Sequence, residues 1–128
     1  MALRLSDLRF NFVNPMPISH VVCELSELCD PGSRGFSIEL NGETLEFLLV
    51  RKGLQVYAYQ NHCPHTGINL EWQPDQFLDL SNSYIQCATH GALFRIEDGH
   101  CLRGPCAGDR LHAIPVGIEN GQVLIDLT

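Results

Sequence analysis

The amino-acid sequence predicts an all-β fold. Short runs rich in β-branched and aromatic residues follow one another along the 128 residues, and some alternate, as Val123, Ile125 and Leu127 do. The pairs Asn41-Gly42 and Asn120-Gly121 indicate tight hairpin turns, because both central residues of such turns need a positive φ. No amphipathic stretch of helical length stands out. Together these observations favour an all-β domain.

Seven segments have the composition of strands, and turn residues separate most of them. In chain order they are 21–25, 36–40, 44–50, 55–59, 84–87, 111–116 and 122–127. Arg51-Lys52-Gly53 indicates the turn between the third and fourth segments. Residues 26–29 predict one helical turn, which Asp30-Pro31-Gly32 ends. Residues 72–82 fit either a short helix or an irregular loop.

Length and composition indicate one globular domain with an N-terminal extension. Hydrophobic residues make up 45% of the chain, so a domain of this size can bury a core without disulfide bonds. Asn14-Pro15-Met16-Pro17 interrupts any regular element. Residues 1–13 are therefore expected to form an extended arm that either pairs at a sheet edge or is mobile. We divide the chain into an extension, 1–19, and a domain, 20–128.

The charge balance disfavours two classes of partner. Eight Lys and Arg residues stand against fifteen Asp and Glu residues, which gives a formal net charge of −7. Phosphate backbones and anionic lipid repel a chain with this much negative charge. We therefore expect neither nucleic acid nor a membrane as a partner. No apolar run approaches the ~20 residues of a membrane span, and residues 1–12 lack a secretory apolar region. The expected location is the cytoplasm.

Cysteine and histidine residues gather between residues 61 and 106, which hold four of the six cysteines and four of the six histidines. Two pairs stand out, Cys63-Pro64-His65 and Cys87-Ala88-Thr89-His90, and glycine follows each pair closely. Two thiolates and two imidazoles suit either zinc or an iron–sulfur cluster of mixed ligation. A cysteine nucleophile with a histidine base is a third reading. Glycine lets backbone amides come close to a bound cluster.

The spacing of these pairs and of the residues after them resembles a known family. Cys63-x-His65-x-Gly67 and Cys87-x-x-His90-Gly91, followed by Phe94, Gly99 and Gly104-Pro105, are similar to the signature of Rieske [2Fe–2S] proteins. From about residue 20 onward the chain resembles a small free-standing Rieske ferredoxin. A zinc site leaves the glycines unexplained and more often uses Cys-x-x-Cys pairs, so we favour the cluster.

The resemblance implies one [2Fe–2S] cluster per chain, bound within residues 61–107. Cys63 and Cys87 would hold one iron and His65 and His90 the other, as ligands of both metal and cofactor. It also implies stacked antiparallel sheets, with the cluster held by two loops at one tip. The segment 71–83 is expected to be an insertion beside the cluster.

The Rieske family that this chain resembles has a high-potential and a low-potential class, and four positions indicate the low-potential class. High-potential members have an additional cysteine in each ligand loop, where this chain has Ile68 and Thr89. They also have a serine and a tyrosine that donate hydrogen bonds toward sulfur, where this chain has Ala92 and Phe94.

The resemblance therefore predicts a one-electron carrier without catalytic activity of its own. Its expected donor is a flavin-dependent reductase, and its expected acceptor is an oxygenase or another redox enzyme. The alternative is the small subunit of a multi-subunit oxidoreductase similar to nitrite reductase. An oxygenase is not expected, since it needs a long further domain with a 2-His-1-carboxylate iron site.

The other cysteines and histidines are assigned mainly to packing or to the surface. Cys23 and Cys29 are expected to be small core residues. Cys101 and Cys106 are assigned either to packing or to a redox-sensitive pair. His62 is expected to be exposed, with tuning of the cluster as the alternative. Trp72 is expected to cover the cluster loops.

Overall fold

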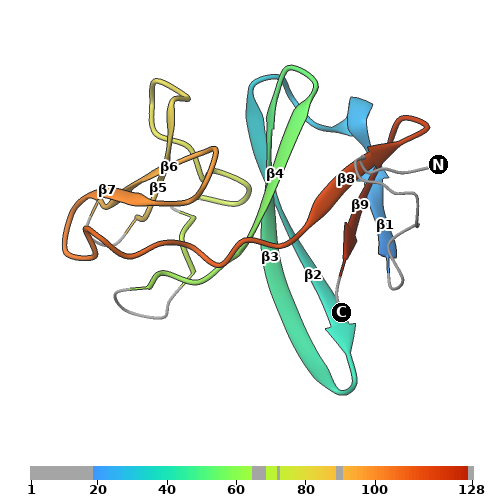
Figure 1. Cartoon of the computed structure of the whole chain (residues 1–128), viewed down its shortest axis with the longest axis horizontal. Helices are drawn as coiled ribbons and strands as arrows, with labels where there is room; N and C mark the ends of the chain where they lie inside the picture. The colour runs from blue at the N-terminus through green and yellow to red at the C-terminus, as the bar shows by residue number, and fades with distance from the viewer. Residues whose placement is uncertain (1–18, 65–68, 72, 89–90, 127–128) are drawn as a thin grey trace.

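The computed structural model describes residues 19–64, 69–71, 73–88 and 91–126. These residues form nine strands in three antiparallel sheets, with the orders β1-β9-β8, β2-β3-β4 and β5-β6-β7 (Figure 1). The elements are β1 (Ser19–Glu24), the 3-10 turn η1 (Leu25–Glu27), β2 (Gly32–Leu40), β3 (Glu43–Lys52), β4 (Gln55–Gln60), β5 (Tyr84–Gln86), β6 (Leu93–Arg95), β7 (Cys101–Arg103), β8 (Val116–Glu119) and β9 (Gln122–Asp126). The all-β prediction is confirmed.

Strand β3 is buried on both faces and separates two cores. Because side chains alternate along a strand, Phe47 and Leu49 face one core and Leu48 and Val50 face the other. The first core lies between the sheets β2-β3-β4 and β1-β9-β8. We call these two sheets together the body, and the core between them the body core. The second core lies between β3 and β4 on one side and residues 61–111, as far as they are described, on the other. We call those residues the cysteine lobe (left in Figure 1).

The predicted hairpin turns are confirmed by their backbone angles. Asn41 and Gly42 have φ of 53° and 85° between β2 and β3, and Asn120 and Gly121 have φ of 53° and 78° between β8 and β9. Gly53, with φ of 63°, lies in the turn between β3 and β4. The helical turn predicted at 26–29 is η1, which begins one residue earlier and ends two residues earlier.

The strand prediction for 111–116 is wrong. Pro115 lacks a backbone N–H, so a regular ladder cannot continue through it. The segment instead makes an isolated bridge between Tyr59 and Ala113, and β8 begins at Val116. Strands β6 and β7, each of three residues, were not predicted. The described part of 72–82 is irregular, which decides between the two alternatives for it.

Cys29 is a second correction, because its side chain is exposed. Leu28, its neighbour, occupies the buried position after η1. Cys23 does lie in the body core, as predicted. The predicted N-terminal extension lies outside the described residues except for Ser19, where β1 begins. Among the residues that the structure describes, no helix is long and apolar enough to span a membrane.

Candidate metal centre

The first predicted ligand loop follows β4, and Asn61 closes it. The Asn61 Oδ1 accepts a hydrogen bond from the backbone N–H of Leu70 at 2.7 Å, and its Nδ2 donates to Glu71 Oε1 at 3.0 Å. The Asn61 backbone N–H donates to the carbonyl of Glu46 in β3 at 2.9 Å. Asn61 thus holds both ends of the loop against the body, and Cys63 lies within it with 2% of its surface exposed.

The second predicted ligand loop joins β5 to β6. The Cys87 N–H donates to the Ala92 carbonyl at 2.9 Å, and the Gly91 N–H donates to the Cys87 carbonyl at 3.0 Å. Gly91 has φ of 66°, a conformation that favours glycine. The Ala88 N–H donates to the Leu70 carbonyl at 3.0 Å, and this bond fastens the second loop to the end of the first.

A third segment packs on the second loop through Gly104. A Cβ atom at Gly104 would lie 2.8 Å from the Cα of Ala92 and 3.0 Å from its Cβ. Gly104 also has φ of 107°. Only glycine therefore permits this approach, which explains why a glycine follows β7.

The two predicted cysteine ligands both lie in the second core. Cys63 and Cys87 are 2% and 1% exposed and share this core with Ala92. His65 and His90, together with Ile68, Thr89 and Trp72, lie outside the described residues. Among the described residues no group of three or more His, Cys, Asp or Glu side chains is arranged to hold a metal ion. Two buried thiols from two hydrogen-bonded loops fit a group that takes thiolate ligands.

Cys101 and Cys106 lie in the same core and face each other. Their Sγ atoms are 2.9 Å apart, and the Cys101 thiol donates to the carbonyl of Arg103 at 3.3 Å. Burial, and then the hydrogen bond with Cys101, raise the pKa of Cys106 to about 12. The Cys106 thiol is therefore neutral at physiological pH, unlike a thiolate ligand.

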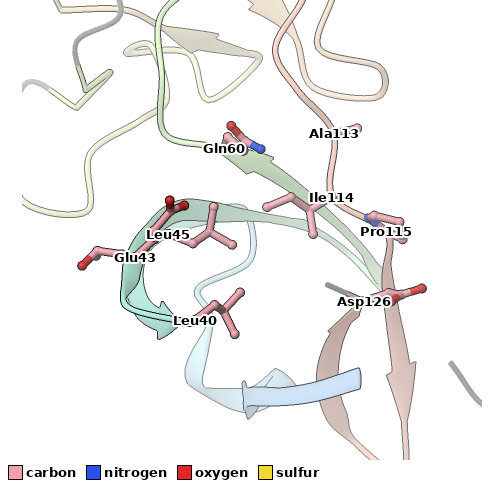
Figure 2. A pocket seen from close by; sticks show the side chains of 9 residues that line it. Leu40, Glu43, Leu45, Gln60, Ala113, Ile114, Pro115 and Asp126 are labelled. Carbon is pink, nitrogen blue, oxygen red and sulfur yellow. The ribbon is translucent and has the colours of Figure 1, made fainter. Parts of the chain in front are cut away.

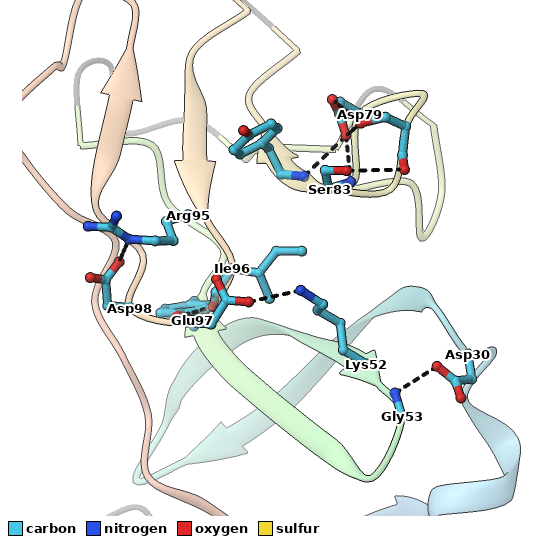
Figure 3. A network of polar contacts seen from close by, with 12 residues as sticks. Asp30, Lys52, Gly53, Asp79, Ser83, Arg95, Ile96, Glu97 and Asp98 are labelled. Atoms are coloured by element: carbon cyan, nitrogen blue, oxygen red, sulfur yellow. Dashed lines mark hydrogen bonds and ion pairs between the residues drawn. The ribbon is translucent and has the colours of Figure 1, made fainter.

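Polar contacts join residues 95–98 of the cysteine lobe, which follow the second loop, to strands β3 and β4 of the body (Figure 3). The buried Tyr59 hydroxyl of β4 donates to the carbonyl of Ile96 at 2.6 Å. Its burial raises the pKa of the Tyr59 phenol above its usual range. At the surface, Lys52 Nζ lies 2.9 Å from Glu97 Oε2, and this hydrogen bond holds the pKa of Glu97 below its usual value.

The segment 71–83 fastens the lobe to β2. The Gly35 N–H donates to Asp75 Oδ1 at 2.8 Å, and the Ser33 hydroxyl donates to the Asp75 carbonyl at 2.8 Å. Phe77 from this segment is fully buried in the second core. The predicted insertion therefore contributes to packing, and Leu80 at its tip is exposed.

Two hollows lie near the Gln60 end of β4. The hollow in Figure 2 is lined by Leu40, Leu45, Gln60 and Ile114 on the body side, and none of its lining residues belongs to the two cysteine loops. The other hollow borders the first loop and is lined by polar side chains, among them His62, Arg110 and His112. His62 is exposed, as predicted. We assign no ligand to either hollow.

Asn61 is the site residue that sequence reasoning missed. Its position directly before the first ligand loop was the available signal. Its role depends on Leu70 and Glu71, on the far side of that loop.

Comparison with known proteins identifies the family. The family model for the Rieske [2Fe-2S] domain matches residues 19–116. The chain is 38% identical over 82 residues to cholesterol 7-desaturase nvd of Xenopus laevis, covering 64% of this chain but 17% of that protein. It is 30% identical over 79 residues to the 3-phenylpropionate/cinnamic acid dioxygenase ferredoxin subunit of Escherichia coli (strain K12), covering 62% of this chain and 70% of the subunit.

Solved structures share the fold. The ferredoxin of carbazole 1,9a-dioxygenase from Nocardioides aromaticivorans IC177 matches with a TM-score of 0.68 and 22% identity, over 87% of this chain and 99% of that chain. The terminal oxygenase of carbazole 1,9a-dioxygenase from Novosphingobium sp. KA1 matches with a TM-score of 0.68 and 25% identity, over 86% of this chain and 30% of that chain.

Proposed function

The chain belongs to the Rieske [2Fe–2S] domain family, and from this premise we propose that it is a ferredoxin that carries single electrons to a terminal oxygenase. The observation that carries the proposal is the pair of buried cysteines on two joined loops, in a chain that matches 70% of a dioxygenase ferredoxin subunit. The matched part of the desaturase is only 17% of that protein. The chain therefore matches most of a ferredoxin subunit but only a small part of the desaturase, and this difference in coverage favours a ferredoxin role.

We assign the ligands of one [2Fe–2S] cluster per chain to Cys63 and Cys87 on one iron and to His65 and His90 on the other. When bound, this group accepts and returns one electron at a higher potential than an all-cysteine cluster. The chain's own residues provide a dry setting for it. Cys63 and Cys87 lie among apolar side chains. The Asn61 hydrogen bond closes the first loop, and the Ala88 hydrogen bond joins the second loop to it.

Ala92 and Phe94 are the two positions, among the four that indicate the low-potential class, that the structure describes. Both side chains are buried in the second core and neither has a hydrogen-bond donor. Donors to sulfur stabilise the reduced state, so their absence lowers the potential. A redox titration of the purified protein should give a value near the bottom of the Rieske range, about −150 mV. A value above about +100 mV contradicts this assignment.

The donor would be a flavin-dependent reductase and the acceptor an oxygenase, in the cytoplasm and without catalysis by this chain itself. The alternative, a small subunit of a nitrite-reductase-like enzyme, commonly lacks the cluster ligands. The complete set Cys63, His65, Cys87 and His90 in this sequence favours the ferredoxin.

The test is metal and sulfide analysis of the protein purified in air. We expect a red-brown protein with about two iron and two sulfide per chain and almost no zinc. His65→Ala and His90→Ala should each lose the cluster or make it labile, whereas Cys23→Ala, a change in the body core, should keep full iron content. A colourless protein loaded with zinc contradicts the electron-carrier function.

A further inference from the structure

Cys101 and Cys106 form a thiol pair that the assigned ligand set does not use. Both lie in the second core, 1% and 2% exposed, with their Sγ atoms 2.9 Å apart. That separation is within about 1 Å of a covalent S–S bond, which measures about 2.05 Å. Cys23, by contrast, packs in the body core and belongs to no such pair among the described contacts.

The backbone around the pair keeps the two thiols facing each other. The Cys101 N–H donates to the Asp109 carbonyl at 2.8 Å, and the Asp109 N–H donates to the Cys106 carbonyl at 2.8 Å. The Ala107 N–H donates to the Gly104 carbonyl at 3.1 Å, which tightens the turn between them. These bonds connect the two cysteines through one residue, Asp109, so the backbone holds the two thiols close together.

The pair lies next to an exposed part of the chain. Arg103, Gly104 and Pro105 are exposed, and so are Ala107 and Gly108 beyond Cys106. Exposed residues therefore flank the buried Cys106 on both sides. Local opening of this turn is enough to admit a small molecule.

We propose that Cys101 and Cys106 are a reversible dithiol–disulfide site, separate from the cluster ligands, that exchanges two electrons with small disulfides such as oxidised glutathione. In the forward reaction an S–S bond forms between the two Sγ atoms and the S–S bond of oxidised glutathione breaks. The two thiol hydrogens pass, as protons with two electrons, to the two glutathione sulfurs, so two molecules of glutathione leave.

The disulfide would close a ring that contains Gly104, which packs on Ala92 of the second ligand loop. Oxidation therefore joins β7 covalently to the turn that supports this loop. The site gives the protein a thiol-dependent constraint beside its proposed one-electron centre.

The test is peptide mapping of the cluster-loaded protein, and trypsin separates the two cysteines. Cleavage after Arg95, Arg103 and Arg110 places Cys101 in the peptide 96–103 and Cys106 in 104–110. Cys63 and Cys87 fall together in 53–95. The protein carries Cys29→Ser, which removes the exposed thiol, and is incubated overnight with glutathione and oxidised glutathione at graded ratios. Free thiols are then blocked with N-ethylmaleimide before digestion.

We expect the peptides 96–103 and 104–110 to appear as one linked species, lighter by two hydrogens than their sum, while the visible absorbance of the cluster is unchanged. Dithiothreitol should return both peptides. Cys101→Ser and Cys106→Ser should each abolish the linked species, and dithiothreitol reversal in the parent protein provides the test if either variant fails to fold.

Full blocking of Cys101 and Cys106 at every glutathione ratio overturns the proposal. So does a linked species that contains 53–95, or one that forms only after the cluster absorbance has been lost. None of these outcomes depends on electron-transfer activity, so the ferredoxin function is judged separately.

Discussion

Asn61 bears most directly on the geometry of the first ligand loop. In Asn61→Ala the buried N–H of Leu70 loses its acceptor, and an unsatisfied buried donor costs about 1–3 kcal/mol. We expect the free energy of unfolding of the cluster-loaded protein to fall by that amount, measured in urea. Iron release to a chelator should also become faster.

Asn69→Ala is the matched control for this change. The Asn69 amide donates to Glu46 Oε1 at the surface, where its loss should change the free energy of unfolding by no more than about 0.5 kcal/mol. Equal losses in the two variants would mean that the Asn61 bonds add nothing specific to the loop.

A comparison of substitutions at Gly104 and Gly108 distinguishes the cost of backbone strain from the cost of a steric contact. Both have positive φ, at 107° and 99°, but an added Cβ meets Ala92 only at Gly104 and meets nothing within 4 Å at Gly108. Gly104→Ala should therefore lower the free energy of unfolding by about 1–3 kcal/mol more than Gly108→Ala. Thermal unfolding of both variants, followed by circular dichroism, measures the difference, and identical values would place Gly104 away from the second loop.

Single residues also mark how far the sequence is informative. Cys63 and Cys87 could be proposed as ligands from the sequence because each predicted ligand pair is local, within a few residues of chain. Asn61 was not, since its partners become neighbours only when the loop closes on β3. Cys29 was wrongly assigned to the core because the local pattern does not tell which of two adjacent residues, Leu28 or Cys29, turns inward.

At the level of elements, the Tyr59–Ile96 hydrogen bond joins β4 to the turn after β6 and makes stability depend on alkaline pH. Burial raises the pKa of the Tyr59 phenol in the folded state. Its contribution is fully present below the unfolded pKa of about 10, and it is lost as pH rises above that value.

The comparison of wild type with Tyr59→Phe isolates this effect. Below about pH 9 the wild type should be more stable by about 0.5–1.5 kcal/mol, because the variant lacks the hydrogen bond. Above about pH 10 this advantage should shrink by about 1.4 kcal/mol per pH unit. An advantage that stays constant up to pH 11 would contradict a buried neutral phenol.

The elements that sequence analysis missed share a physical cause. Strands β6 and β7 have three residues each, and their pairing is set by the loops around Cys87 and Gly104. The hairpins of the body were predictable because Asn-Gly turns encode their own geometry. The segment 111–116 has the apolar content of a strand, and only Pro115 signals that the ladder is interrupted.

For the molecule as a whole, the two cores on opposite faces of β3 predict unequal responses to metal removal. The body has its own core, with Phe47, Leu49 and Val123 among its members. The cysteine lobe has short strands and would lose the metal cluster that joins its two loops in the proposed holoprotein.

Removal of iron should therefore leave amide hydrogens of β2 and β3 protected from exchange while those of β5–β7 exchange much faster. Hydrogen exchange followed by mass spectrometry measures both regions in one experiment. Loss of protection in all three sheets together would show that the two cores unfold as one unit.

The net charge of −7 predicts how the reduced protein meets its acceptors. The rate of electron transfer to a basic c-type cytochrome should fall as salt is added, because screening removes the attraction. The rate to ferricyanide, an anion, should rise over the same range. Stopped-flow measurements from low to high ionic strength test both directions. If neither rate changes with ionic strength, the negative charge does not steer these encounters and serves solubility only.

The double burial of β3 has a consequence for biogenesis. The body needs no residue of the cysteine lobe in its own core, so it can fold before any iron is delivered, once β9 has paired with β1. Leu48 and Val50 then lie on the face of β3 that the lobe still has to cover. The unfinished lobe can collapse onto that prepared wall and be released again if a cluster is damaged. If the two cores unfold separately, a chain that has lost its cluster keeps the body folded, and only the lobe has to form again around a new cluster.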